Sequence, residues 1–456
     1  MKHMIMGLTV FVAALMMLLA PAQNFQFWAT IGIATIMVIF WVFEVLPIYV
    51  TALIPLVLAV PLGVLTPEDL AQAYGHKLIF LFFGGFVLSL ALEKWDVHQR
   101  IAELIIRGVG KTKTRLILGF LLATALLSMW VSNTATALMM MPMAIAVINK
   151  IPKKKNSKYP LYLLLSIAYG ASIGGMGTLI GSPTNGAMVA ALETTNNITV
   201  DFMDWFVIGL PLSLIMLFLT YFYFRFLLRN DKNEEFEVLN FEKKKWNKNQ
   251  IRVLILFIII VLIWSFKKLI EPALGVTFGD EIPAVLGAIM LFIIPSTVKS
   301  KPLLEWKDTK RLAWGILLLF GGGLALAEMM IKSGVVLEVS EAFQNYKELP
   351  LFLLLLIFVS FSIFGTEIMS NTALVQVFVP IVAIFAAGAE DYTILQLCMP
   401  VTLAASCAFM LPVSTPPNAI IFSSGRITVN QMVRVGFILN VVSVIIIALF
   451  SLIFIR

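Results

Sequence analysis

The chain has 456 residues, of which 60% are hydrophobic and 13% are charged, and its formal net charge is +7. Soluble domains are only about 45–50% apolar, so this composition excludes an ordinary soluble protein and indicates a chain that exposes apolar side chains to lipid. The positive charge does not indicate nucleic-acid binding, because the lysines and arginines lie in short stretches between long apolar runs, as in the loops of membrane proteins.

A membrane-spanning helix needs about 20 apolar residues. In chain order, the runs that fit this length are 5–20, 27–43, 47–63, 78–93, 160–180, 206–224, 253–266, 282–296, 313–331, 394–413 and 432–455. The first run ends at Pro21 without a small-residue cleavage site, so we interpret it as a span and not as a signal peptide. Cys398 and Cys407 share one apolar run, which argues against a disulfide framework or a metal site.

The basic residues predict the orientation of the spans. If the N-terminus lies inside, alternation of the spans places 27 of the 33 lysines and arginines in inside segments and 6 in outside segments. Loops that face the cytoplasm carry the excess of positive charge. We therefore expect a multi-pass protein of the cell inner (plasma) membrane, with a cytoplasmic N-terminus and an outside C-terminus.

Two further apolar runs carry polar triplets at their centres. The run 116–149 has basic clusters on both flanks, and its 34 residues are too few for two crossings, so it predicts a re-entrant hairpin with Ser132-Asn133-Thr134 at the tip. The run 351–389 contains Ser370-Asn371-Thr372. Its length alone leaves a two-span hairpin open, but the matching triplet favours a second re-entrant hairpin.

The two halves of the chain resemble each other beyond these triplets. Leu81–Gly85 matches Leu319–Gly323, and Ser182–Asn185 matches Thr415–Asn418. The separation is 237 residues from Gly84 to Gly321, 233 from Asn185 to Asn418 and 238 from Ser132 to Ser370, a nearly constant spacing that indicates an internal repeat. Because the matching spans cross in opposite directions under the topology above, the repeat is inverted. Inverted repeats with broken helices are typical of secondary transporters, whose site lies near the bilayer midplane.

Prolines interrupt one apolar run in each half. Gly181–Asn185 breaks the run 160–193, and Ser414–Asn418 breaks the run 394–422. Proline blocks helix continuation, so each break exposes backbone carbonyls that suit sodium and a new helix N-terminus that suits an anion. A single Ser-Asn-Thr triplet is more often a structural cap, but two copies paired with proline breaks favour a carboxylate site. Glu367 is either a proton or cation partner or a satisfied structural hydrogen-bond group.

Four segments resemble the divalent anion:sodium symporter family, specifically its INDY-type dicarboxylate transporters. These segments are Ser128–Thr136, Gly174–Pro183, Thr366–Ala373 and Leu411–Asn418. Members of the family carry dicarboxylates, citrate or sulfate. The resemblance implies an all-α polytopic membrane protein with about eleven transmembrane helices and two re-entrant helical hairpins. It also implies a homodimer and elevator movement of a transport domain against a scaffold.

The resemblance also implies roles for individual residues. The first sodium site would use Ser128, Ser132, Asn133 and the backbone near Gly181, and the second would use Thr366, Ser370, Asn371 and the backbone near Ser414. The substrate residues would be Ser132, Asn133, Thr134, Pro183, Thr184, Ser370, Asn371, Thr372, Thr415 and Pro416. Two residues depart from the family pattern: Thr184 replaces a proline, and Lys77 replaces a neutral residue. A protein-borne cation such as Lys77 near the site is an alternative to bound sodium.

From these observations we expect scaffold helices in 1–77, a first repeat in 78–230, a linker with scaffold helices in 231–312 and a second repeat in 313–456. The expected function is secondary active transport of C4/C5 dicarboxylates such as succinate, malate or 2-oxoglutarate, coupled to sodium symport or to dicarboxylate exchange. A sodium-independent antiporter, a citrate or sulfate transporter and a passive anion channel are the alternatives. An enzyme is disfavoured, because the sequence offers no nucleophile–base pair, metal cluster or cofactor motif. Expected partners are a small dicarboxylate anion and membrane lipid, with no nucleic acid.

Overall fold

The computed structural model describes residues 2–110, 112–150, 158–229, 245–299, 301–342, 349–387 and 392–455. The regular secondary structure of these ranges is helical. Several charged residues that flank the two hairpin runs, 116–149 and 351–389, lie outside the described residues, namely Lys111, Lys153, Lys154, Lys155, Lys347, Glu348, Glu390 and Asp391. Within the described part, six helices are long and apolar enough to cross a membrane, and shorter apolar helices accompany them.

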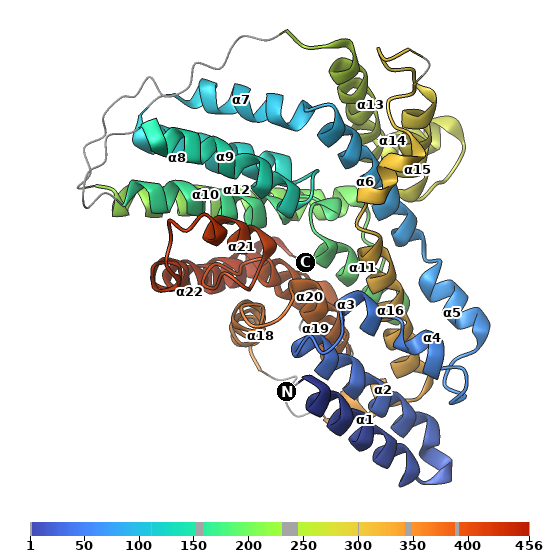
Figure 1. Ribbon diagram of the computed structural model, residues 1–456. Helices are drawn as coiled ribbons and strands as arrows, with labels where there is room; N and C mark the ends of the chain where they lie inside the picture. The colour runs from blue at the N-terminus through green and yellow to red at the C-terminus, as the bar shows by residue number, and fades with distance from the viewer. Residues whose placement is uncertain are drawn as a thin grey trace.

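A first group of helices packs together on one side of the molecule, where α6 contacts α13 and α15, and α16 contacts α2 to α6. Its members are α1 (Lys2–Leu18), α2 (Phe25–Val42), α3 (Ile48–Thr51), α4 (Ile54–Leu58), α5 (Pro67–Tyr74), α6 (Lys77–Lys94), α13 (Lys248–Ser265), α14 (Lys267–Leu274), α15 (Glu281–Ile293) and α16 (Trp314–Lys332), with the short 3-10 helices η1 (Ala22–Asn24) and η3 (Trp306–Arg311). In Figure 1 its helices α5, α6, α15 and α16 run down the right side.

A second group contains both hairpins and both broken helices, which pack on one another and on the long helices α12 and α22. Its members are α8 (Lys113–Ser128), α9 (Asn133–Lys150), α10 (Tyr159–Gly175), η2 (Leu179–Gly181), α11 (Pro183–Asn196), α12 (Phe202–Leu227), α18 (Leu351–Gly365), α19 (Asn371–Ala386), α20 (Ile394–Ala405), α21 (Pro416–Ser423) and α22 (Val429–Phe454). Two helices connect the groups. Helix α7 (Val97–Val109) joins α6 to α8, and helix α17 (Val335–Ala342) leads from α16 toward α18. Helices α8, α9, α10 and α22 fill the left of Figure 1.

The outer faces and inner contacts of the helices follow the rules of membrane packing. Phe218, Phe222 and Phe226 recur every four residues on α12, and each is more than half exposed, so they form an apolar stripe that suits lipid. Inside, small residues bring helix backbones together: a Cβ at Gly84 of α6 would lie 2.5 Å from the carbonyl carbon of Ala284 on α15. Such close contacts stabilise helix pairs in lipid, where apolar burial between helices contributes little.

The sequence predicted most of the helix positions, with one correction. The run 47–63 was expected to be one span, but it forms the two short helices α3 and α4. Pro55 lies in the first turn of α4, and because proline has no backbone N–H it cannot continue the hydrogen-bonding pattern of α3. The helix–break–helix form of both hairpins is confirmed, with α8 ending at Ser128 and α18 ending at Gly365 before the triplets.

Candidate substrate and cation site

The two hairpin tips and the two proline breaks meet at one cavity of about 850 Å³. All ten substrate residues expected from the sequence line it, namely Ser132, Asn133, Thr134, Pro183, Thr184, Ser370, Asn371, Thr372, Thr415 and Pro416. The volume is within the usual range for a small-molecule pocket, about 300–1,000 Å³. The structure therefore brings together polar segments that are hundreds of residues apart in the chain.

The cavity extends toward one end of the molecule. Its wall on the first helix group includes Gly85, Ser89 and Glu93 of α6, together with Arg311 just before α16. Glu93 lies 16 residues after Lys77, the first residue of α6, which corresponds to about 24 Å along the helix axis. We call the charged end of the cavity wall, at Glu93 and Arg311, the mouth; it lies at the C-terminal end of α6, far from the N-terminal end of that helix.

Four helices begin at this cavity. Asn133 is the first residue of α9, Pro183 of α11, Asn371 of α19 and Pro416 of α21, and all four residues line the wall. Each helix N-terminus has unpaired N–H groups and the equivalent of about half a positive charge. Four of them together direct the equivalent of about two positive charges toward the cavity without any lysine or arginine at the triplets. Such a cavity suits a dianion.

The hydroxyl at the base of each hairpin tip binds the asparagine of the triplet. Ser128 Oγ donates a hydrogen bond to Asn133 Oδ1 at 2.5 Å. In the second hairpin, Thr366 Oγ1 lies 2.6 Å from Asn371 Oδ1 and 2.9 Å from the carbonyl oxygen of Ala405. Thr366 therefore connects the asparagine of the second tip to the last residue of α20.

The oxygens around Gly181 point to a cation position in the first repeat. A Cβ at Gly181 would lie 2.8 Å from the carbonyl oxygen of Gly175 and 3.1 Å from both the Met129 carbonyl oxygen and Thr178 Oγ1. A Cβ at Gly175 would lie 3.0 Å from both side-chain polar atoms of Asn133. Glycine is therefore required at both positions for the break and the tip to approach closely. The donor set is hydroxyl, amide and carbonyl oxygen, which fits sodium.

The predicted sodium residues divide into two layers. Gly181, Ser132, Asn133, Ser370, Asn371 and Ser414 line the cavity, whereas Ser128 and Thr366 are fully buried behind the asparagines that they contact. Ser132 Oγ accepts a hydrogen bond from Ala135 N at 3.2 Å and so caps the start of α9. Thr184 at the start of α11 is hydrogen-bonded to Ser182. Whether these residues bind sodium stays a prediction.

One asparagine in each break holds the unwound backbone in shape, a role that the sequence analysis did not assign. Asn185 Nδ2 donates to the carbonyl oxygens of Gly175 at 2.9 Å and Thr178 at 2.8 Å. Asn418 Nδ2 lies 2.9 Å from the carbonyl oxygen of Ala408 and 3.0 Å from that of Leu411, so the offsets of ten and seven residues are the same. The repeated Asn after each proline was the available sequence signal.

Glu367 connects the second hairpin to the second break. Its Oε1 accepts hydrogen bonds from Met410 N at 2.8 Å and Asn440 Nδ2 at 2.7 Å, and its Oε2 accepts one from Leu411 N at 3.0 Å. The side chain is buried, with 3% exposure. Of the two roles considered for Glu367, these three donors favour the structural one. The equivalent position of the first repeat, 238 residues earlier, is Met129.

Lys77 does not lie near the triplets. It is absent from the cavity wall and forms an ion pair with Glu193, ten residues after the start of α11. The geometry therefore gives no support to Lys77 as a protein-borne cation at the site. Within the described residues, no group of three or more His, Cys, Asp or Glu side chains is placed to hold a metal ion, and Cys398 and Cys407 are free thiols in the core.

Comparison with known proteins gives consistent matches. The model of the citrate transporter family matches residues 38–396. The sodium-dependent dicarboxylate transporter SdcS of Staphylococcus saprophyticus is 35% identical, over 98% of this chain and 89% of the relative. SdcS of Staphylococcus aureus (strain USA300) is 36% identical, over 92% of this chain and 84% of the relative.

Two solved membrane transporters share the fold at low identity. The YdaH transporter of Alcanivorax borkumensis aligns with a TM-score of 0.56 at 13% identity, covering 84% of this chain and 86% of its own. MtrF of Neisseria gonorrhoeae, from a class of antimetabolite efflux pumps, aligns with a TM-score of 0.57 at 12% identity, covering 85% and 82%. The chain is a multi-pass membrane transporter and not an enzyme; it belongs to the citrate transporter family and, with the SdcS relatives, to the divalent anion:sodium symporters.

Proposed function

We propose that this protein is a secondary active transporter of C4/C5 dicarboxylates, of the succinate, malate and 2-oxoglutarate class, coupled to sodium symport. The observation that carries the proposal is the convergence of four helix N-termini and two Ser-Asn-Thr triplets on one cavity. The name of the SdcS relatives, sodium-dependent dicarboxylate transporter, supports both the substrate class and the ion.

The substrate would bind with one carboxylate at each hairpin tip. Asn133 and Thr134 face the cavity from the first tip, and Asn371 and Thr372 face it from the second. Neutral amides and hydroxyls, with the helix N-termini behind them, stabilise two carboxylates without the cost of a fixed charge buried in the membrane. A monocarboxylate would engage only one tip and would bind more weakly.

Sodium would bind behind each tip and make the carboxylate site complete. The oxygens of Ser128, Asn133 and Gly181 would hold one ion, and those of Thr366, Asn371 and Ser414 the other. Each ion would connect a hairpin tip to the break opposite it, so that binding of the cation orders the groups that contact the substrate. Because each ligand then raises the affinity for the other, the two are thermodynamically coupled.

Transport would follow from the inverted repeat by movement of the second helix group, as the transport domain, against the first group, as the scaffold. With the orientation expected from the basic residues, the mouth at Glu93 and Arg311 faces the cytoplasm, so the cavity corresponds to an inward-open state. We further propose a homodimer in the inner membrane, with a cytoplasmic N-terminus and an outside C-terminus.

The test is uptake of labelled succinate into proteoliposomes, with the sodium gradient and the internal dicarboxylate varied independently. Symport predicts saturable uptake that requires an inward sodium gradient. Uptake that needs internal dicarboxylate but no sodium would replace symport by exchange, and flux that neither saturates nor shows counterflow would indicate a channel. Absence of uptake under all conditions by a protein that elutes as a single species would refute the dicarboxylate assignment.

A further inference from the structure

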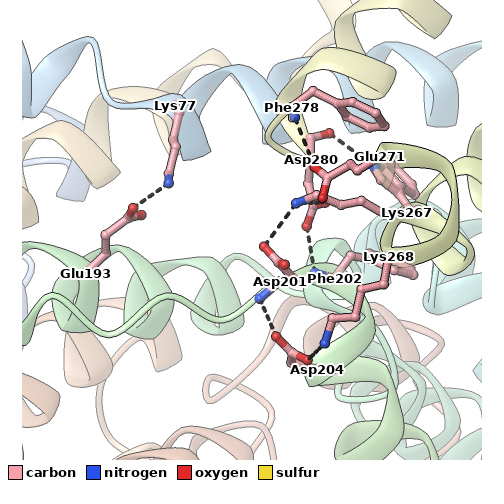
Figure 2. A network of polar contacts seen from close by, with 11 residues as sticks. Lys77, Glu193, Asp201, Phe202, Asp204, Lys267, Lys268, Glu271, Phe278 and Asp280 are labelled. Atoms are coloured by element: carbon pink, nitrogen blue, oxygen red, sulfur yellow. Dashed lines mark hydrogen bonds and ion pairs between the residues drawn. The ribbon is translucent and has the colours of Figure 1, made fainter. Parts of the chain in front are cut away.

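Ion pairs gather at the N-terminal end of α6, about 24 Å from the cavity mouth. Figure 2 shows Lys77 pointing from α6 to Glu193 of α11, beside a larger cluster around Lys267. Lys267 Nζ lies 3.3 Å from Asp201 Oδ1 and 3.2 Å from Asp280 Oδ1. A second pair joins Lys268 to Asp204 at 2.9 Å. The function proposed above uses none of these residues.

Within this cluster Lys267 and Asp280 are shielded from solvent, whereas the Asp201 side chain is 40% exposed. The Lys267 side chain is 11% exposed and that of Asp280 is 8% exposed. Burial raises the pKa of Asp280 in spite of its lysine partner, whereas Asp280 and Asp201 raise the pKa of Lys267 against the effect of burial. Asp280 also accepts hydrogen bonds from Phe202 N at 2.6 Å and, through its backbone oxygen, from Trp264 Nε1 at 2.9 Å. Shielding strengthens the attraction between Lys267 and Asp280 and holds the lysine in place to pair with Asp201 of the second group.

Three of these ion pairs join the two helix groups, namely Lys77–Glu193, Lys267–Asp201 and Lys268–Asp204, whereas Lys267–Asp280 lies within the first group. Lys77, Lys267 and Asp280 belong to the first group, at α6, α14 and the start of α15. Glu193 and Asp201 belong to the second group, in the last turn of α11 and at the N-cap of α12. The contacts lie at the opposite end of α6 from the mouth. Movement of one group along the other would have to break them.

Two rigid connections lead from this closed end to the cavity. Helix α11 begins in the cavity wall at Pro183 and reaches Glu193 ten residues later, about 15 Å along its axis. The second connection is aromatic: Trp130, in the cavity wall next to the first tip, stacks on Phe202 with ring centroids 6.0 Å apart, and Phe202 stacks on Trp264 at 4.8 Å. Both connections give a continuous path of packed residues between the site and the ion pairs.

We propose that the ion pairs Lys77–Glu193 and Lys267–Asp201, with Asp280 and Lys268–Asp204 beside them, form a latch between the two helix groups. The latch holds the protein in the state in which the cavity is open at the mouth, and it must break before the cavity opens at the opposite end. The inference rests on the alternating movement proposed above. Weakening the latch then shifts the population toward the state that is open at the opposite end.

The test places a reporter cysteine under the latch. Ala190 of α11 is 2% exposed and lines a small gap with Phe320 and Gly323 of α16, so Ala190→Cys is protected while the latch is closed. The native Cys398 and Cys407 are fully buried and give no background in folded protein. In the Lys77→Gln/Lys267→Gln double variant, we expect labelling by a membrane-impermeant maleimide to become about threefold faster or more.

The matched control is Lys332→Gln. Lys332 pairs with Asp69 at 2.6 Å, at the same end of the molecule, but both residues belong to the first helix group. We expect this variant to label at the parent rate and the exchanged pair Lys77→Glu/Glu193→Lys to label close to it. Unchanged labelling of a double variant that elutes as a single species would overturn the latch, as would an equal increase with Lys332→Gln. Because labelling needs neither sodium nor substrate, its outcome is independent of the dicarboxylate assignment.

Discussion

Two substitutions of Glu367 should destabilise the protein by different amounts. Its carboxylate accepts three hydrogen bonds, from Met410 N, Leu411 N and Asn440 Nδ2. Glu367→Ala leaves the buried Asn440 amide and the partly buried N–H groups of Met410 and Leu411 without their acceptor, so the free energy of unfolding should fall by about 3–5 kcal/mol. Glu367→Gln keeps one acceptor oxygen but turns an NH₂ group toward one of the N–H donors, so its loss should be about 1–3 kcal/mol.

Cys398 and Cys407 supply the assay for this prediction. Both thiols are fully buried, so a fluorogenic thiol reagent reports their exposure during thermal unfolding. We expect the midpoint temperatures to rank wild type above Glu367→Gln above Glu367→Ala, and sodium-driven uptake by Glu367→Gln to keep the pH dependence of the wild type. Loss of that pH dependence in Glu367→Gln, or a Glu367→Ala midpoint equal to wild type, would refute the structural role and restore the proton-partner hypothesis.

Three further predictions concern the site. Asn133→Ala and Asn371→Ala should each abolish succinate uptake without changing the elution profile, because each removes the amide of one hairpin tip; near-normal uptake by both would mean that the triplets are structural. Gly175→Ala should raise the sodium concentration for half-maximal uptake by about tenfold or more, since its Cβ would displace Asn133; an unchanged value would remove Asn133 from the first cation site. Asn418→Ala should destabilise the protein by about 1–3 kcal/mol, because the carbonyl oxygens of Ala408 and Leu411 lose their side-chain donor. The same thiol assay measures this loss.

The sequence predicted the hairpin tips and breaks because each carries a local signal. A run of 34 residues between basic flanks is too short for two crossings, and a proline in an apolar run interrupts a helix wherever it occurs. The constant spacing between the halves also indicated that the two tips and the two breaks are corresponding parts of one repeat. Their meeting at one cavity was expected from the family resemblance, and the structure places all ten predicted substrate residues there.

What the sequence did not predict depends on contacts between distant residues. Glu193 lies 116 residues after Lys77, and nothing local to either residue indicates their ion pair, so Lys77 was considered near the site instead. The run 47–63 is apolar enough for a span although Pro55 divides it. Hydropathy averaged over a whole run does not reveal the helix break caused by the missing N–H of one proline. The structural role of Asn185 was missed because its two hydrogen bonds to backbone carbonyl oxygens form only once the break has folded.

The proposed sodium coupling follows from how the site balances charge. Helix N-termini attract a dianion, but their charge is only a redistribution of peptide dipoles, and the net charge of the loaded site would still be that of the substrate. Moving an uncompensated dianion through the hydrocarbon region is costly. Two sodium ions behind the tips at Asn133 and Asn371 would make the loaded site neutral and would also hold the two asparagines that face the substrate. The same ions would thus select the substrate and permit its movement, which is why neutral side chains suffice at both triplets.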